Sequence, residues 1–229
     1  MPEQLLSIIV PIYNEEKIVA AALPKIFALP VNKEVIIVND GSTDQTAAIL
    51  ADLARHYSFQ LINQPTNRGK GAAVKRGLEE ISGDYFIVCD ADLEYEPTDI
   101  MTLLKLAATA NDHVAIYGSR FLTSPRLTGP YLVNKCLTVL TNLLFGSRLT
   151  DMETCFKLIP RSALPHLKLR GRRFEIEPEI TAQLLKAGYQ IQEIPIHYAR
   201  RSYQEGKKIK ARDGLLAIQT LVAEKLFRS

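Results

Sequence analysis

The chain has 229 residues, of which 47% are hydrophobic and 23% charged, a balance that fits a folded α/β domain and argues against disorder. The formal net charge is only +3, too small to indicate nucleic acid as a partner. The three cysteines, Cys89, Cys136 and Cys155, are widely spaced, so we expect reduced thiols rather than disulfides or a zinc site.

The first half of the chain alternates between short apolar segments and helical patterns. Runs rich in Ile and Val predict strands at residues 5–10, 34–38, 59–63, 85–89 and 113–118. Helical periodicity lies between them, at residues 15–28, 43–56, 70–81 and 97–110. Apolar strands joined by helices predict a mostly parallel sheet covered on both faces. Ligands of such sheets bind beyond the carboxyl ends of the strands, so we expect the functional site there.

Three of the predicted strands run into polar segments. The first continues into Pro11-Ile12-Tyr13-Asn14-Glu15, the second ends in Asn39-Asp40-Gly41-Ser42, and the fourth in Asp90-Ala91-Asp92. Any one of these could be a turn followed by a helix cap. Three that converge on one edge of a sheet favour a ligand site.

The Asp90-Ala91-Asp92 segment is a candidate metal site. Two carboxylates at a strand end, with Glu94 as a third, offer the oxygen ligands that Mg²⁺ and Mn²⁺ both accept. A cation there would bridge a diphosphate and neutralise the charge that grows on a departing nucleoside diphosphate. An Asp-x-Asp pair is a weak signal by itself, and its position after an apolar strand strengthens it.

Asn67-Arg68-Gly69-Lys70-Gly71 follows the third predicted strand and opens a helix. Its glycines, basic side chains and helix N-terminus predict a phosphate-binding turn that includes Lys70. The spacing is neither that of a P-loop nor that of a dinucleotide fingerprint. The alternative is a helix start with solvated basic residues.

The alternation weakens after residue 118. We expect a loop at residues 120–130, amphipathic helices at 131–145 and 215–227, a helix with an acidic first turn at 173–186, and a strand at 190–196. The first amphipathic helix has an apolar stripe and an opposite polar face. The stripe comprises Leu132, Cys136, Val139, Leu140 and Leu143, and the polar face Asn134, Lys135, Thr138, Thr141 and Asn142. Such helices either pack on the domain or insert shallowly into a membrane, and both readings stay open.

Neither a secretory leader nor a membrane-spanning segment is expected. Residues 1–6 lack a basic segment followed by an apolar run. No uninterrupted apolar stretch approaches the roughly 18–20 residues that cross a bilayer. We therefore expect any contact with a membrane to be peripheral.

Five motifs in order carry a family resemblance. They are Pro11-Ile12-Tyr13-Asn14-Glu15, Asn39-Asp40-Gly41-Ser42, Asp90-Ala91-Asp92, Gly118-Ser119-Arg120, and Asp151-Met152-Glu153-Thr154-Cys155-Phe156-Lys157. The chain resembles glycosyltransferase family 2, and within it the dolichyl- and polyprenyl-phosphate sugar synthases. The resemblance implies a nucleotide-diphospho-sugar transferase fold over residues 1–229, with a donor-binding half (1–118) and an acceptor-binding half (119–229).

The implied reaction is the inverting, metal-dependent transfer of a hexose from UDP-glucose or GDP-mannose to a polyprenyl or dolichyl phosphate. The enzyme would be cytoplasmic, in peripheral contact with the cytoplasmic face of a membrane, and compatible with a separate membrane-spanning partner. Two departures from the family pattern bear on this. Asn39 replaces an Asp, and Glu153-Thr154-Cys155-Phe156 replaces the Ser-Gly-Phe form of many mannosyl-transferring relatives, so both donors stay open.

The resemblance, together with the basic turn and the basic residues of the second half, assigns roles to individual residues. Expected to bind the nucleotide sugar are Pro11, Tyr13, Glu15, Asp40, Lys70, Asp90 and Ala91. Asp90, Asp92 and Glu94 would hold the metal, and Asp92, Arg120 and Asp151 would be catalytic. Expected to bind the acceptor phosphate are Arg120, Lys135, Arg201 and Lys207.

The acceptor determines whether a base is needed. A phosphate monoester has a second pKa near 6, so at neutral pH it is already a nucleophile and needs cations to position it. A hydroxyl acceptor needs a carboxylate base, and Asp151 is the candidate in that case. Two other functions stay open: a family 2 transferase that acts on a saccharide or other hydroxyl, and a non-catalytic module that binds a nucleotide sugar or a partner.

Overall fold

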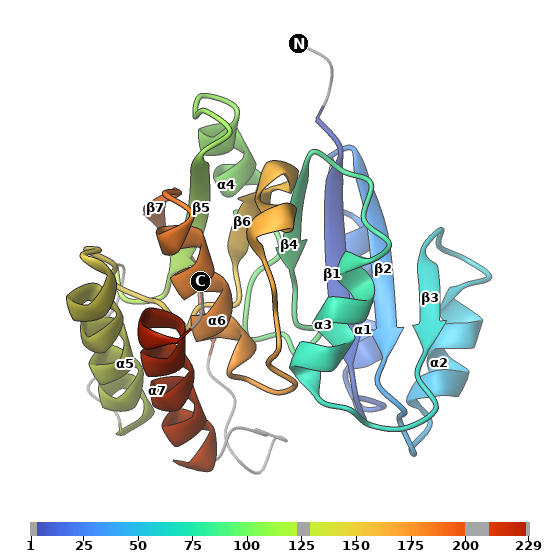
Figure 1. Cartoon of the computed structure of the whole chain (residues 1–229). Helices are drawn as coiled ribbons and strands as arrows, with labels where there is room; N and C mark the ends of the chain where they lie inside the picture. The colour runs from blue at the N-terminus through green and yellow to red at the C-terminus, as the bar shows by residue number, and fades with distance from the viewer. Residues whose placement is uncertain (1–3, 123–128, 200–210, 228–229) are drawn as a thin grey trace.

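The computed structural model describes residues 4–122, 129–199 and 211–227, and its centre is one seven-stranded sheet (Figure 1). The strand order is β3-β2-β1-β4-β6-β5-β7, in which β6 pairs antiparallel with β4 and β5 and the other pairs are parallel. The strands are β1 Leu6–Ile12, β2 Lys33–Asn39, β3 Gln60–Asn63, β4 Tyr85–Val88, β5 Val114–Ser119, β6 Lys157–Pro160 and β7 Gln190–Pro195. The predicted mostly parallel sheet is confirmed, but β6 was not predicted.

Helices cover both faces of the sheet. They are α1 Val19–Phe27, α2 Thr46–Leu53, α3 Lys70–Leu78, α4 Asp99–Ala107, α5 Gly129–Phe145, α6 Ile176–Lys186, α7 Ala211–Leu226 and the 3₁₀ helix η1 Arg161–His166. In Figure 1, α3 and α6 lie in front of the sheet, α1 lies behind it, and α5 and α7 lie together at its left. The predicted first helix was too long at its start, because residues 16–18 form a turn and α1 begins only at Val19.

Burial explains why the strands read as continuous apolar runs. Leu6, Ile8, Ile9 and Val10 of β1 are all fully buried, since β1 is an inner strand with helices on both faces. A second, smaller core joins α5, α6 and α7. It consists of Leu137, Leu149, Met152, Ala182, Ala217 and Leu221. This core attaches the α5–α7 pair to the rest of the domain.

Helix α5 turns most of its predicted apolar stripe outward and much of its predicted polar face inward. Leu132, Val139 and Leu143 of the predicted stripe are 54%, 47% and 78% exposed, whereas Thr138 and Thr141 are fully buried. The two hydroxyls donate hydrogen bonds to main-chain oxygens one turn earlier, both at 2.9 Å, so the buried polar groups are satisfied within the helix. None of the helices within the described ranges is long and apolar enough to cross a membrane.

Candidate active site

The segments after β1 and β2 are tied together by the side chain of Asn14. Its main-chain N–H donates to Ser42 Oγ at 3.0 Å, and its Oδ1 accepts from the Thr43 N–H at 2.8 Å. Tyr13 and Glu15, on either side of Asn14, are half-buried at this edge of the sheet. Two of the three predicted polar segments therefore form one structural unit.

Asn39 joins the ends of β2 and β3 in a way that an Asp could not. Its Nδ2 donates to Asn63 Oδ1 at 2.9 Å, while its Oδ1 accepts from the Ser42 N–H at 3.1 Å. A carboxylate has no N–H to donate. The departure from the usual Asp at this position thus has a local structural reason.

Asp40 is buried beneath the predicted phosphate-binding turn. Its two carboxylate oxygens accept from the main-chain N–H groups of Arg68 and Gly69, both at 2.8 Å. Burial raises the pKa of Asp40, and the two N–H donors oppose that rise. Asp40 therefore fixes the turn from below.

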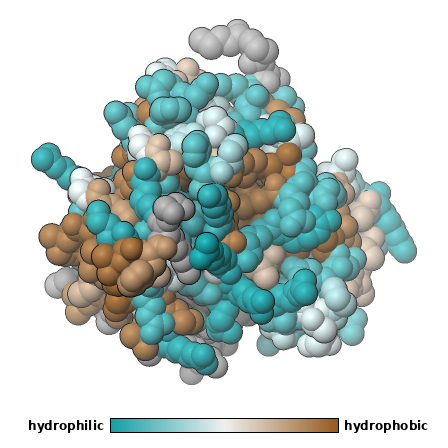
Figure 2. Space-filling view, viewed as in Figure 1, coloured by the Kyte–Doolittle hydropathy of each residue, from teal (hydrophilic) through white to brown (hydrophobic). Residues whose placement is uncertain are grey.

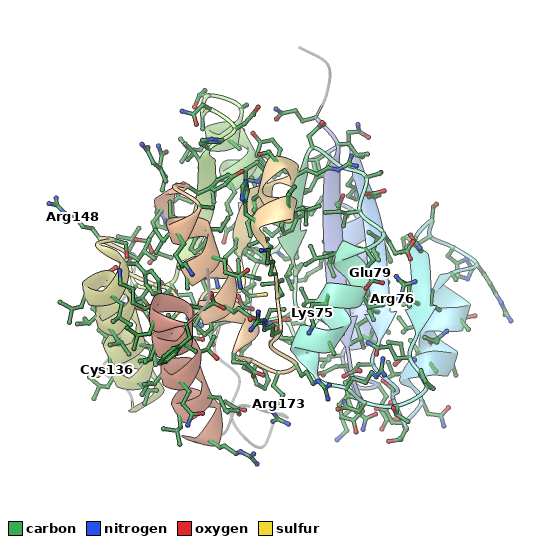
Figure 3. The ribbon with its side chains drawn as sticks, viewed as in Figure 1. Lys75, Arg76, Glu79, Cys136, Arg148 and Arg173 are labelled. Atoms are coloured by element: carbon green, nitrogen blue, oxygen red, sulfur yellow. The ribbon has the colours of Figure 1, made fainter. Side chains whose placement is uncertain are left out.

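The turn also packs closely against residues 170–173. Gly69 has a φ of +96°, and a Cβ there would lie 2.3 Å from the Arg172 carbonyl oxygen. On the same side, Lys75 Nζ donates to the Arg170 carbonyl at 3.1 Å, and Arg173 Nε lies 3.3 Å from Asp213 Oδ1 on α7 (Figure 3). Residues 170–173 thus link the turn to α7.

A chain of alternating charges runs inward from Asp90. Lys70 Nζ lies 2.8 Å from Asp90 Oδ2 and 3.2 Å from Glu177 Oε1, and Lys157 Nζ lies 2.7 Å from Glu177 Oε2. Burial would lower the pKa of Lys70, but the negative charges of Asp90 and Glu177 raise it well above its usual value. Lys70 is therefore a fixed cation beside Asp90. Glu177 was missed from the sequence, where the acidic start of its helix indicated only a dipole effect.

Asp90 and Asp92 offer two partly exposed carboxylates beyond β4. Glu94 is directed elsewhere, because its Oε2 accepts from the Tyr198 hydroxyl at 2.5 Å. Over the described residues, no three or more His, Cys, Asp and Glu side chains gather into a group that could hold a metal ion. The role of Glu94 as a third ligand therefore stays a prediction. Two hard oxygen ligands still fit Mg²⁺ or Mn²⁺ when phosphate and water oxygens complete the shell.

Arg120 is held by Asp151 through both carboxylate oxygens. Arg120 Nε donates to Oδ2 and Nη2 donates to Oδ1, each at 2.7 Å, and the Arg120 main-chain N–H donates to Oδ2 at 3.0 Å. Asp151 is fully buried, and the guanidinium carbon lies 5.2 Å from the centre of the Tyr198 ring. With both oxygens engaged, Asp151 positions Arg120 and is not placed to accept a proton from a hydroxyl acceptor.

Glu193 supports this pair from β7 and was not predicted. Its carboxylate accepts from the main-chain N–H groups of Thr150 at 2.7 Å and Asp151 at 2.9 Å. Burial raises the pKa of Glu193, and these hydrogen bonds counteract the rise. A single Glu in a predicted strand gave no signal of this role.

The remaining predicted residues are less closely placed. Pro11 lies in β1, and Ala91 is buried between the two aspartates. Lys135 is half-buried on α5, and no hydrogen bond or ion pair within the described ranges joins it to Arg120. Arg201 and Lys207 lie outside the described residues.

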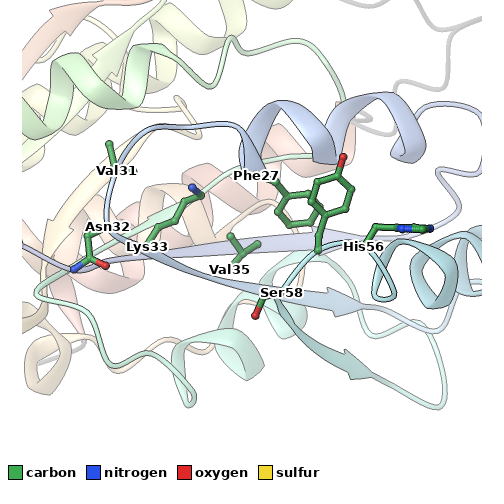
Figure 4. A pocket seen from close by; sticks show the side chains of 8 residues that line it. Phe27, Val31, Asn32, Lys33, Val35, His56 and Ser58 are labelled. Carbon is green, nitrogen blue, oxygen red and sulfur yellow. The ribbon is translucent and has the colours of Figure 1, made fainter.

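A surface cavity of about 390 Å³ lies away from these groups (Figure 4). It is lined by Phe27, Val31, Asn32, Lys33, Val35, His56, Tyr57 and Ser58. Because Lys33 is the first residue of β2, the cavity lies at the edge of the sheet opposite Asp40 and Asp90. It forms no part of the candidate site.

The profile of the glycosyl transferase family 2 matches residues 7–167, which is more than half of the chain. The chain belongs to glycosyl transferase family 2. Among curated relatives of this glycosyltransferase, a dolichyl-phosphate beta-glucosyltransferase of Trichomonas vaginalis is 30% identical, over 94% of this chain and 71% of the relative. A dolichol-phosphate mannosyltransferase of Pyrococcus furiosus is 28% identical, over 88% of this chain and 58% of the relative.

Solved structures place this family 2 enzyme in the nucleotide-diphospho-sugar transferase fold. The glucosyl-3-phosphoglycerate synthase of Mycobacterium tuberculosis with UDP has a TM-score of 0.74 at 19% identity, covering 96% of this chain and 80% of the other. The same synthase with Mn²⁺, UDP and phosphoglyceric acid has a TM-score of 0.74 at 18% identity, covering 97% and 79%. At these identities the likeness supports the fold alone, and the predicted fold class is confirmed.

Proposed function

We propose that this glycosyltransferase transfers a hexose, with inversion, from UDP-glucose or GDP-mannose to a polyprenyl or dolichyl phosphate. The observation that carries the proposal is the buried Arg120–Asp151 pair, with two contacts of 2.7 Å. It presents a fixed cation and leaves Asp151 without a free oxygen, which suits an acceptor that arrives ionised. The relatives named as dolichyl-phosphate transferases support the same acceptor class.

On the donor side, residues 67–71 at the start of α3 would bind the diphosphate through basic side chains, because the Arg68 and Gly69 N–H groups already donate to Asp40. Tyr13, Glu15 and Asp40 lie at the edge where the nucleoside would bind, with Pro11 preceding them in β1. Asp90 and Asp92 would hold Mg²⁺ or Mn²⁺; a solved neighbour of the same fold is a complex with Mn²⁺ and UDP. A bound cation would supply charge neutralisation for the diphosphate. Lys70 offsets the negative charge of Asp90 from the inner side.

The transfer step is a single displacement. An oxygen of the acceptor phosphate, held by Arg120, forms a bond to the anomeric carbon of the sugar. The bond between that carbon and the diphosphate oxygen breaks, and the nucleoside diphosphate leaves with the electron pair. Burial alone would lower the pKa of Arg120, but its neighbours, Asp151 foremost, together raise the pKa well above its usual value, so the cation persists throughout the accessible pH range.

The α5–α7 pair is the surface that we propose for contact with the cytoplasmic face of an anionic membrane. Figure 2 shows apolar residues gathered over these two helices, at the left of the view. The exposed apolar residues are Leu132, Val133, Val139, Leu143, Leu215, Ile218, Leu226 and Phe227. Arg148, Arg212 and Lys225, all exposed on or beside these helices, would face anionic headgroups. A lipid acceptor resides in a membrane, so a membrane is the partner that we propose for this surface.

The test is a transfer panel with the full chain. UDP-glucose and GDP-mannose are each supplied with a short polyprenyl phosphate or an alkyl glycoside, with Mn²⁺, Mg²⁺ or a chelator. We expect metal-dependent sugar transfer to the lipid phosphate, reduced at least about 100-fold in Asp92→Ala and retained in Asp52→Ala, an exposed control. Transfer to the alkyl glycoside alone would overturn the phosphate acceptor, and donor binding without any turnover would favour a binding module.

A further inference from the structure

Glu153 lies on a segment whose main chain is held almost continuously. The N–H of Met152 donates to Thr138 Oγ1 at 3.1 Å, and that of Cys155 donates to the Tyr95 hydroxyl at 3.1 Å. Just before them, the Thr150 and Asp151 N–H groups are bound by Glu193. The main chain on both sides of Glu153 is therefore held in place.

The carboxyl group of Glu153 has an unusual environment for a residue in such a rigid segment. The residue is partly exposed, yet its Oε1 is buried and has no hydrogen-bond partner among the described residues. A buried oxygen without a donor costs about 1–3 kcal/mol when left unpaired, and more when it is charged. Such atoms in native proteins often mark functional groups.

Four charged side chains of the acceptor-binding half act on Glu153. They are Lys157 on β6, Glu177 on α6, and the Arg120–Asp151 pair. Two are positive and two negative, so they largely cancel. Burial then dominates and raises the pKa of Glu153 to about 7, so the group is mostly a neutral acid below neutral pH.

We propose that Glu153 is a further acceptor-binding residue, which donates a hydrogen bond from its neutral carboxyl group to an oxygen of the acceptor phosphate. A neutral acid can lie beside a phosphate that Arg120 binds, whereas a carboxylate would repel it. The inference rests on the phosphate acceptor proposed above. It also assigns a use to Glu153, which lies in one of the departures from the family pattern described above.

The pH dependence of acceptor binding tests this role. Above its pKa the carboxyl ionises, so we expect the KM of wild-type enzyme for polyprenyl phosphate to rise about tenfold per pH unit above pH 7.5. The phosphate itself only gains negative charge as pH rises, which would strengthen its attraction to Arg120 and lower the KM. The expected rise in KM with pH is therefore opposite to the fall in KM that ionisation of the acceptor phosphate alone would cause.

The decisive variant is Glu153→Gln, which stays neutral and keeps a hydrogen-bond donor. Its KM for polyprenyl phosphate should change less than about threefold between pH 7.5 and 8.5, whereas wild type and the exposed control Glu79→Gln (Figure 3) should show the full rise. Thermal unfolding confirms that each variant is folded. If Glu153→Gln does not fold, the wild-type profile still decides the question.

Three outcomes would count against parts of the reasoning. A wild-type KM that is flat or falls with pH would overturn the role of Glu153 while leaving the lipid phosphate acceptor in place. An equal rise in Glu153→Gln would do the same. If wild type transfers sugar only to an alkyl glycoside, and Glu153→Gln lowers kcat at every pH, then Glu153 is a general base and the proposed acceptor is wrong.

Discussion

Replacing Asp151 with Asn tests whether the Arg120–Asp151 pair is as desolvated as its geometry indicates. The substitution keeps the shape of the side chain but removes its charge and turns one acceptor oxygen into a donor. Because Asp151 is fully buried and all three of its contacts with Arg120 are 3.0 Å or shorter, Arg120 would be left without its counter-charge. Breaking a buried pair from one side costs about 3–5 kcal/mol.

For a chain of this size, that loss corresponds to a fall of roughly 10 °C in the unfolding midpoint. Differential scanning calorimetry of Asp151→Asn and wild type measures it. Asp52→Asn is the matched control, because Asp52 meets Arg55 at 3.4 Å with both side chains mostly exposed. Its cost should stay below about 1 kcal/mol. Equal midpoints for the two variants would refute the argument that Arg120 depends on a desolvated partner.

Three further outcomes follow from the structure. Gly69→Ala should lose about 3 kcal/mol of stability by urea unfolding, because its Cβ would lie 2.3 Å from the Arg172 carbonyl oxygen. The control Gly188→Ala, where φ is +83° but the space is open, should lose only about 1 kcal/mol. Similar losses in the two variants would contradict the close packing of the turn. Leu143 is 78% exposed, so Leu143→Ala should keep the wild-type unfolding midpoint but bind anionic vesicles about tenfold more weakly in co-sedimentation. Unchanged vesicle binding would argue against the α5–α7 surface as a membrane contact. Folding raises the pKa of Glu153 from 4.5 to about 7, so the contribution of Glu153 to stability falls as pH rises through that window. The thermal unfolding midpoint of Glu153→Gln, relative to that of wild type, should therefore increase between pH 4.5 and 7. A constant difference between the two midpoints would contradict the shift.

The sequence predicted the donor edge well because the signals there are local. Apolar runs identify buried strands, and polar residues directly after them must lie at the carboxyl edge of the sheet. Asp90 and Asp92 are found by this rule alone. β6 was not predicted because its four residues, Lys157–Pro160, begin with a charge and end in a proline, and because they fall between segments without regular alternation.

The partners of the site side chains could not be predicted, because they come from distant parts of the chain. Glu177 lies 20 residues from Lys157, and the bond from Tyr198 to Glu94 spans 104 positions. Glu94 illustrates the consequence: its spacing from Asp92 fits a metal ligand, but its hydrogen bond with Tyr198 could not be read from that spacing. Local spacing gives the residue types of a site, and tertiary contacts decide which of them meet.

The orientation of α5 shows how one periodic pattern permits two opposite arrangements. The apolar stripe and the polar face are equally regular in the sequence, so the period alone cannot say which side packs inward. Thr138 and Thr141 can be buried at low cost because each hydroxyl is satisfied by a carbonyl of its own helix. The stripe then faces outward, with Leu143 78% exposed, and that exposure is unfavourable in water. An apolar surface that covers α5 and α7 would recover this free energy, and a bilayer that also contains a polyprenyl acceptor would place that acceptor beside the half of the enzyme that carries Arg120.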